Sequence, residues 1–436
     1  MPSDSSAGNH LRRPASPSLW RDTDFRRLWM GQTASQLGEH ATSVVLPLLA
    51  VLTLQADAGR LGALRAVGQA PILLLALFAG VWVDRWRTRT TMALADAGRA
   101  LVLAVAAVAC LCGRFGLTGL FVLAFTVGAL SVFFDVAYQA SLVRLVRRDR
   151  LLSANSALEG SRSAAQIGGP ALGGALVSLL PAPAATAAGA LLFALSFLAI
   201  RRIRGSEALP ERPARPSRVR HGVNEGLRFV ARDRLLRAVC LASAAFQLSF
   251  AALMTVYLLF LPRELHLSGT VVGLTLAVAG PGALLGSFLA ARLPVRFGYG
   301  PMLVCAAAAG DAAFLCVPAL HGSSAVTVAA LLVVDFVFGC GGQLVNVALM
   351  AVRQTATPDG MQGRVAATIT FVGMGLTPLG SLIGGLLAGE WGLRTSLLTT
   401  AAGMMLSPAL MVLSPLARLG RELPPPHGES RTARLP

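Results

Sequence analysis

The stretch of sequence that decides the fold runs from Leu117 to Val143 and reads LTGLFVLAFTVGALSVFFDVAYQASLV. It holds a single charged residue, Asp135, among apolar side chains. As a helix rising 1.5 Å per residue, it is long enough to cross the roughly 30 Å hydrocarbon core of a bilayer. Lipid offers no partner to free backbone amides and carbonyls, so an apolar run of this length predicts a transmembrane helix.

The whole chain repeats this pattern. Its 436 residues are 54% hydrophobic and 14% charged, with a mean hydropathy of +0.64, whereas soluble domains are roughly 25% charged. One span with its connection takes roughly 30 to 35 residues, so the length predicts about twelve spans. We expect an all-α integral membrane protein. The predicted spans are 28–54, 61–83, 92–112, 117–143, 153–180, 184–202, 236–261, 268–292, 301–320, 324–352, 365–389 and 394–416.

The ionisable composition excludes several classes of activity. The chain has no lysine, and all 38 basic residues are arginine. A Walker A ATPase and Schiff-base chemistry are therefore excluded on this chain. The six histidines are scattered, and the six cysteines all fall in apolar stretches, which predicts packing thiols, no metal site, no cofactor and no enzyme. Complete use of arginine favours a bacterium with a GC-rich genome.

The arginines also predict the orientation. If the N-terminus is cytoplasmic, 31 arginines fall in the tails and cytoplasmic loops, four fall in the loops on the other side, and three (Arg65, Arg99 and Arg162) fall within the predicted helices. This positive-inside pattern predicts two cytoplasmic termini in the plasma membrane. It also assigns the net charge of +17 to topology and anionic lipid rather than to nucleic acid.

An internal repeat predicts two six-helix halves. Gly80 and Gly286, Arg144 and Arg353, and Pro170 and Pro378 recur at offsets of 206, 209 and 208 residues. Parallel repeats of this kind are typical of transporters that bind their substrate between two halves near the midplane. The expected units are a cytoplasmic tail (1–24), the first half (25–202), a central loop with an amphipathic helix (203–235), the second half (236–418) and a second cytoplasmic tail (419–436).

The turn between the second and third spans carries the most specific motif. It reads Gly80-Val-Trp-Val-Asp84-Arg85-Trp-Arg87-Thr-Arg89. A glycine permits close helix contact, and the Asp-Arg pair can hold the turn against neighbouring helix ends. The motif resembles the signature of the major facilitator superfamily. Arg87 stands where that pattern often has glycine, and the second half has Ala290 in place of the aspartate.

Further segments resemble one branch of that superfamily, which contains enterobactin exporters and macrolide-efflux-like proteins. They are 25–29, 134–137, 149–155, 169–174 and 363–365, and the resemblance covers residues 20 to 418. It implies proton-coupled export of small, often amphiphilic molecules by a functional monomer.

The fifth span also resembles the antiporter signature of such transporters, Gly-Pro-x-x-Gly-Gly. Gly169, Pro170, Gly173 and Gly174 match it, although Ala165 replaces an expected glycine. Proline removes one helix hydrogen bond and glycine allows close approach, so tight packing or a kink is the alternative interpretation.

Glu39 is the leading candidate for proton coupling. It lies about 18 Å into the first span, where an ionisable group is costly. Gln32, Gln36 and Glu39 share one helix face with Ser35 and Ser43, which predicts a face that borders a wet cavity. Desolvation favours the neutral acid there, so Glu39 can exchange a proton as its exposure alternates. The alternative is a packed acid, either protonated or paired with His40.

Asp135 in the fourth span has two functional interpretations. It can accept the arginines of the 80–89 turn (Arg85, Arg87 or Arg89) in a state-dependent lock, or it can be a second proton site; a structural acid is the third alternative. Asp96 and Arg99 are three residues apart, which predicts that they pair with each other or with that turn. Tyr138 and Gln247 are further candidates for the cavity wall.

These observations favour a secondary exporter of a drug, siderophore or other natural product that works by proton antiport with alternating access. Its partners would be the small-molecule substrate, protons and the bilayer. An importer or facilitator of a small solute and a transport-inactive sensor are the alternatives.

Overall fold

The computed structural model describes residues 19–83, 86–145, 151–204, 219–358 and 361–422. These segments are helices joined by short connections, and no strand occurs among them. Nine helical segments in this part of the chain are long and apolar enough to cross a membrane. The chain is therefore a multi-pass, all-helical membrane protein, while the count of twelve spans and the symmetry of two halves stay predictions.

The first six long helices form one group. They are α1 (Thr23–Leu48), α2 (Ala58–Val83), α3 (Thr88–Leu111), α4 (Leu117–Leu145), α5 (Leu151–Leu179) and α6 (Ala182–Arg201). A π-helical turn, η2 (Leu49–Thr53), continues α1. Within this group α1 packs on α5 and α6, α2 on α4, and α3 on α4 and α6. Asp22 caps α1 by accepting hydrogen bonds from the backbone amides of Asp24 and Phe25.

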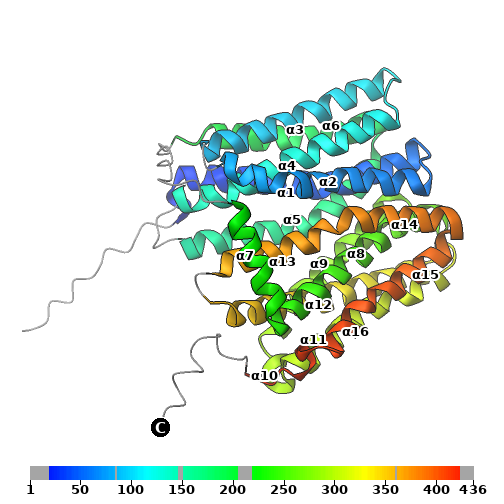
Figure 1. Cartoon of the computed structure of the whole chain (residues 1–436). Helices are drawn as coiled ribbons and strands as arrows, with labels where there is room; N and C mark the ends of the chain where they lie inside the picture. Colours follow the sequence, from blue (N-terminus) through cyan, green and yellow to red (C-terminus); the bar gives the residue numbers. More distant parts are fainter. Residues whose placement is uncertain (1–18, 84–85, 146–150, 205–218, 359–360, 423–436) are drawn as a thin grey trace, which may run out of the picture.

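The remaining helices form a second group after α7 (Val219–Arg232). They are α8 (Arg234–Arg263), α9 (Gly269–Ala290), α10 (Leu293–Phe297), α11 (Tyr299–Ala312) with the 3₁₀ segment η4 (Ala313–Ala319), α12 (Ala325–Ala356), α13 (Gln362–Gly375), α14 (Thr377–Trp391), α15 (Leu393–Met404) and α16 (Leu406–Val412). Here α9 packs on α12, α8 on α14 and α15, and α11 on α12. Figure 1 shows α7 running crosswise to the long helices.

Two of the predicted spans are interrupted. The stretch 365–389 divides into α13 and α14 at Leu376, and 394–416 divides into α15 and α16 at Met405. Pro378 and Pro408 follow these breaks. A proline has no amide hydrogen and crowds the preceding turn, so the helix ends before it and starts again.

The helix expected in the central loop is present. It was predicted over 223–236, and it forms as α7 from Val219 to Arg232, before α8 starts at Arg234. Val230 is buried, and α7 packs on α13 and α8. Its apolar face therefore has a protein partner.

Candidate functional site

A buried ion pair on α3 is the centre of the polar site. Asp96 and Arg99 lie one helical turn apart, and both side chains are fully buried. They form the predicted ion pair with each other. Ser35 of α1 also donates a hydrogen bond to the Asp96 carboxylate, with 3.2 Å between the oxygens, and Ser196 of α6 donates to the other carboxylate oxygen. The pair thus ties α3 to α1 and α6.

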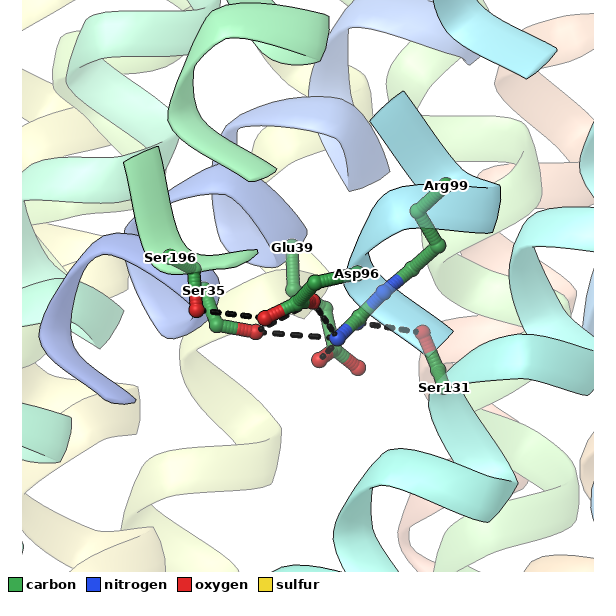
Figure 2. A network of polar contacts seen from close by, with 6 residues as sticks. All are labelled: Ser35, Glu39, Asp96, Arg99, Ser131 and Ser196. Atoms are coloured by element: carbon green, nitrogen blue, oxygen red, sulfur yellow. Dashed lines mark hydrogen bonds and ion pairs between the residues drawn. The ribbon is translucent and has the colours of Figure 1, made fainter. Parts of the chain in front are cut away.

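Arg99 connects this pair to Glu39 (Figure 2). Its guanidinium donates to the hydroxyl oxygens of Ser131 on α4 at 3.0 Å and of Ser35 at 2.9 Å. One of its nitrogens lies 3.5 Å from Glu39 Oε2. The rings of Phe134 and Phe193 stand 4.6 and 4.4 Å from the guanidinium carbon, which adds cation–π contacts. Helices α1, α3, α4 and α6 therefore meet at one guanidinium.

Glu39 faces a cavity of about 290 Å³ between α1, α2 and α4. The Glu39 side chain is 32% exposed, whereas Asp96 and Arg99 are closed off from the cavity. Asp135 of α4 borders the same cavity and makes no hydrogen bond or ion pair within the described residues. The lining consists of Glu39, Thr42, Ser43, Leu46, Pro47, Leu64, Arg65, Gly68, Gln69, Ile72, Ala124, Val127, Gly128, Ser131, Val132 and Asp135.

A second cavity of about 320 Å³ lies in the other helix group, between α8, α11, α12, α13 and α16. Gln247, predicted for the cavity wall, lines this one rather than the cavity of Glu39. Asp311 and Arg353 line it as well, and Asp311 Oδ2 is buried without a hydrogen-bond partner. The predicted polar residues are thus divided between two cavities.

The other predicted cavity residues occupy different places. Gln32 and Gln36 are buried on α1, and neither lines the two cavities described above. Tyr138 is half-buried and packs against the apolar cluster around Phe134. Glu39 pairs with Arg99, while the Cβ atom of its neighbour His40 packs against Gly169 on α5. The roles proposed for these side chains stay predictions.

The predicted gating turn is only partly described. Asp84 and Arg85 lie outside the described residues, and Gly80 falls within the last part of α2. Arg87 caps the start of α3, where its backbone carbonyl accepts a hydrogen bond from the Thr91 amide. Arg89 lines a basic hollow together with Arg27, Arg201, Arg202 and Arg204. The lock between this turn and Asp135 therefore stays a prediction.

The glycines of the helix-5 motif lie at close helix contacts. A Cβ atom at Gly173 would stand 2.5 Å from the carbonyl oxygen of Ala41 on α1, and one at Gly174 would stand 2.2 Å from that of Gly269 on α9. Pro170 contributes its carbonyl to the α9 contact, 2.5 Å from a Cβ atom built at Gly273. The motif thus packs α5 between α1 and α9, which favours the packing interpretation, and an antiporter role stays a prediction.

The two helix groups contact each other where α5 packs on α9 and where α2 packs on α14. We call the end where α1 begins and α2 ends the basic end, and the other the opposite end. Gly62 of α2 packs on Gly385 of α14 near the opposite end, as Gly174 packs on Gly273. Arg263 also donates to the carbonyl of Ala56 there, at 2.6 Å. These contacts close the opposite end.

Sequence reasoning missed two features of the site. It treated Arg65 only as one of three arginines inside helices, yet Arg65 borders the Glu39 cavity. It also did not single out Ser131 and Ser196, which bind the Asp96–Arg99 pair from α4 and α6. The signal for Arg65 was available: no acidic residue lies within four positions of it in the sequence, so no ion pair within its own helix turn accounts for its charge.

Comparison with known proteins shows the family. The family model described as transmembrane secretion effector matches residues 15–426. A relative named multidrug efflux pump Tap, from Mycobacterium tuberculosis, is 28% identical over 87% of this chain and 91% of its own length. A relative from Bacillus subtilis named as an uncharacterized MFS-type transporter, YfiS, is 26% identical over 84% of this chain and 86% of its own.

Solved structures agree on the fold. A mutant of the nucleoside transporter NupG superposes with a TM-score of 0.74 at 11% identity and covers 89% of this chain and 99% of its own. An inward-facing bacterial homologue of the iron transporter ferroportin superposes with a TM-score of 0.73 at 17% identity, covering 91% and 99%. At these identities the likeness concerns the fold alone. The chain belongs to the transmembrane secretion effector family of the major facilitator superfamily of transporters.

Proposed function

We propose that this chain exports small amphiphilic molecules across the plasma membrane in exchange for protons, by alternating access. The observation that carries the proposal is the pairing of a cavity-facing acid, Glu39, with the buried guanidinium of Arg99. A carboxyl group that borders a cavity at membrane depth can take up or release a proton as the cavity changes its exposure. A relative named multidrug efflux pump supports the direction of transport.

In the proposed cycle Arg99 keeps its charge while Glu39 exchanges a proton. Arg99 keeps its ion pair with Asp96 and its hydrogen bonds to Ser35 and Ser131 whether or not Glu39 is ionised. Protonation of Glu39 removes one negative charge from the cavity wall without leaving Arg99 unpaired. Substrate and proton can therefore compete for Glu39, which is the requirement for exchange.

The helix contacts at the opposite end support an inward-facing state in the proposed cycle. With the termini in the cytoplasm, as the arginine distribution predicts, closure at Gly62–Gly385 and Gly174–Gly273 corresponds to an inward-facing state. The outward-facing state requires α2 to part from α14 and α5 to part from α9. In the proposed cycle, Asp135 and the turn with Gly80, Asp84, Arg85, Arg87 and Arg89 close the cytoplasmic end at that stage.

Inverted membrane vesicles from an efflux-deficient bacterial host test this proposal. Respiration acidifies their lumen, which quenches acridine orange, and an exporter that exchanges protons for substrate then relieves the quenching. We expect at least one of two amphiphilic amines, norfloxacin and its ethyl ester, to restore fluorescence in vesicles with the natural chain and neither to do so with Glu39→Gln.

Glu390→Gln is the matched control, because Glu390 is an exposed glutamate at the end of α14. Vesicles with this variant should behave like the natural ones. Accumulation of either compound that persists after a protonophore has abolished the gradient would show that protons do not drive transport.

A further inference from the structure

Arg65 faces the Glu39 cavity without a counter-ion among the residues that the structure describes. It lies on α2 and lines the cavity together with Glu39 and Asp135. Its Nε atom is buried and has no hydrogen-bond acceptor, and no acidic side chain forms an ion pair with it in the part of the chain that the structure describes. A guanidinium at membrane depth is expensive unless an anion or a hydrogen-bond acceptor accompanies it.

The other two arginines in the interior of the predicted spans, Arg99 and Arg162, have acidic counter-ions, although Arg99 Nε, like Arg65 Nε, has no hydrogen-bond acceptor. Arg99 has Asp96, two serine hydroxyls and two aromatic rings. Arg162 pairs with Glu159 one turn earlier on α5, through two nitrogens. The comparison marks Arg65 as a cation that is kept open toward the cavity. A planar guanidinium binds carboxylates through two parallel hydrogen bonds, so a carboxylate is the partner its geometry fits.

The charges of the cavity are ordered along its length. At 1.5 Å per residue, Arg65 lies about 10 Å from the start of α2 at the opposite end. Asp135 lies about 27 Å from the start of α4 at that same end, and Glu39 falls between them on α1. The cation is thus nearest the closed end, and the two acids lie toward the basic end.

The wall between these charges is mainly apolar, with Thr42, Ser43, Gln69 and Ser131 as its uncharged polar residues. Leu46, Leu64, Ile72 and Val127 belong to its apolar part, around a volume of about 290 Å³. Such a wall accepts a compact hydrophobic body, while the few polar groups fix its orientation. A ligand that pairs with Arg65 and with both acids, Glu39 and Asp135, carries an anionic group at one end and a basic nitrogen toward the other.

We infer that this cavity selects amphoteric molecules and that Arg65 is the residue that binds their carboxylate, with Glu39 and Asp135 facing the basic nitrogen. The inference rests on the proposed export function and names its substrate class. It differs from binding of a cationic amphiphile, for which an unpaired arginine in the cavity would be unfavourable.

Binding of a matched pair of probes to the full chain in lipid nanodiscs tests the inference. The pair is norfloxacin, a fluorescent aryl carboxylic acid with a basic piperazine nitrogen, and its ethyl ester, which lacks the carboxylate. Fluorescence anisotropy should show that the natural chain prefers the acid by about tenfold, the size expected for a hydrogen-bonded charge pair. Arg65→Gln should remove this preference, because it weakens the affinity for the acid and leaves the affinity for the ester within about twofold of the natural value.

Two variants separate recognition from structure. Arg65→Lys keeps the charge and should retain part of the preference, because it loses the second hydrogen bond. Arg60→Gln is the matched control: Arg60 begins the same helix, is exposed and pairs with Asp57, so its replacement should change neither affinity. The inference would be overturned if the natural chain bound the acid and the ester equally well or bound neither measurably. It would also be overturned if Arg65→Gln weakened the affinities for the acid and the ester equally.

Transport is measured separately, so that the two proposals can fail independently. If the chain prefers the acid through Arg65 but vesicles show no proton-driven uptake of it, the export proposal fails and the ligand class stands. If vesicles take up the ester as readily as the acid, and Arg65→Gln changes neither rate, export stands and the ligand class fails.

Discussion

Arg99 holds four helices together and, in the proposed mechanism, is also the partner of the coupling residue Glu39. It is fully buried and has Asp96 as its fixed counter-ion, while Glu39 is its partner at the cavity wall. Breaking a buried pair by removing one partner costs about 3–5 kcal/mol, because the remaining charge has no compensation. Replacing both partners with apolar side chains of similar volume is far milder.

We therefore expect Asp96→Leu to lower the midpoint of thermal unfolding in detergent strongly, by the equivalent of about 3 kcal/mol or more. The double change Asp96→Leu with Arg99→Met should recover most of this loss. Both midpoints are measured by heating samples to a series of temperatures and then using size-exclusion chromatography to determine the fraction that stays folded. A double variant less stable than Asp96→Leu would show that Arg99 stabilises the fold independently of its counter-ion.

A second prediction concerns Ser196, which donates a hydrogen bond to Asp96 from α6. Ser196→Ala leaves the ion pair in place but removes one donor to a buried carboxylate, so we expect a loss of about 1.5–3 kcal/mol. Thr186→Ala on the same helix is the matched control, because its hydroxyl donates to the backbone carbonyl of Ala182 within α6. Equal losses for both variants, by the same thermal assay, would contradict a special role for Ser196.

At the scale of helices, glycine contacts decide which end of the bundle is closed. The α5–α9 and α2–α14 crossings bring backbones together at Gly174 and Gly62, where no side chain fits. Close approach of this kind gives strong van der Waals packing between membrane helices. In the proposed alternating-access cycle these contacts separate in the outward-facing state, so we expect the crossings to set the balance between the two states.

Gly174→Val should shift this balance toward opening of the opposite end, because its first carbon would overlap the carbonyl of Gly269. The readout is labelling of a cysteine at Ser381, which is buried and donates a hydrogen bond to Gln69 on α2. The experiment uses a background without the six native cysteines. There we expect a membrane-impermeant maleimide to label Ser381→Cys several-fold faster when Gly174→Val is also present.

Gly389→Ala is the control for that experiment, since no atom lies within 4 Å of a Cβ atom at Gly389. It should leave the labelling rate unchanged. If Gly174→Val also leaves it unchanged, the α5–α9 crossing does not hold the end closed.

The contact of α7 with α13 predicts that close packing at Gly226, rather than an ion pair, holds α7 in place. Gly226 lies against α13, where a Cβ atom would stand 2.6 Å from the Thr368 hydroxyl, while the Glu225–Arg364 ion pair beside it is exposed. Exposed pairs contribute about 0–1 kcal/mol. Gly226→Leu should therefore speed tryptic cleavage after Arg228, and Glu225→Gln should barely change it. The reverse order would show that the ion pair holds α7.

At the scale of the whole molecule, the sequence predicted the helical membrane fold and the family, because long apolar runs and the 80–89 turn depend on local physics. The breaks at Leu376 and Met405 were not predicted, although Pro378 and Pro408 signalled them. The pairing of Glu39 with Arg99 was also missed. The two residues lie on different helices, α1 and α3, which come together because both pack on α6. Tertiary contacts of this kind leave no periodic signal.

The measurement that tests the central claim most directly compares small molecules in cells and medium by mass spectrometry, with and without this gene. The deletion strain is complemented with the natural chain, Glu39→Gln or Glu390→Gln. We predict that a compound accumulates inside deletion cells and falls in their medium, and that Glu390→Gln restores export while Glu39→Gln does not. Full rescue by Glu39→Gln, or a compound that instead builds up in the medium of deletion cells, would contradict proton-coupled export through Glu39.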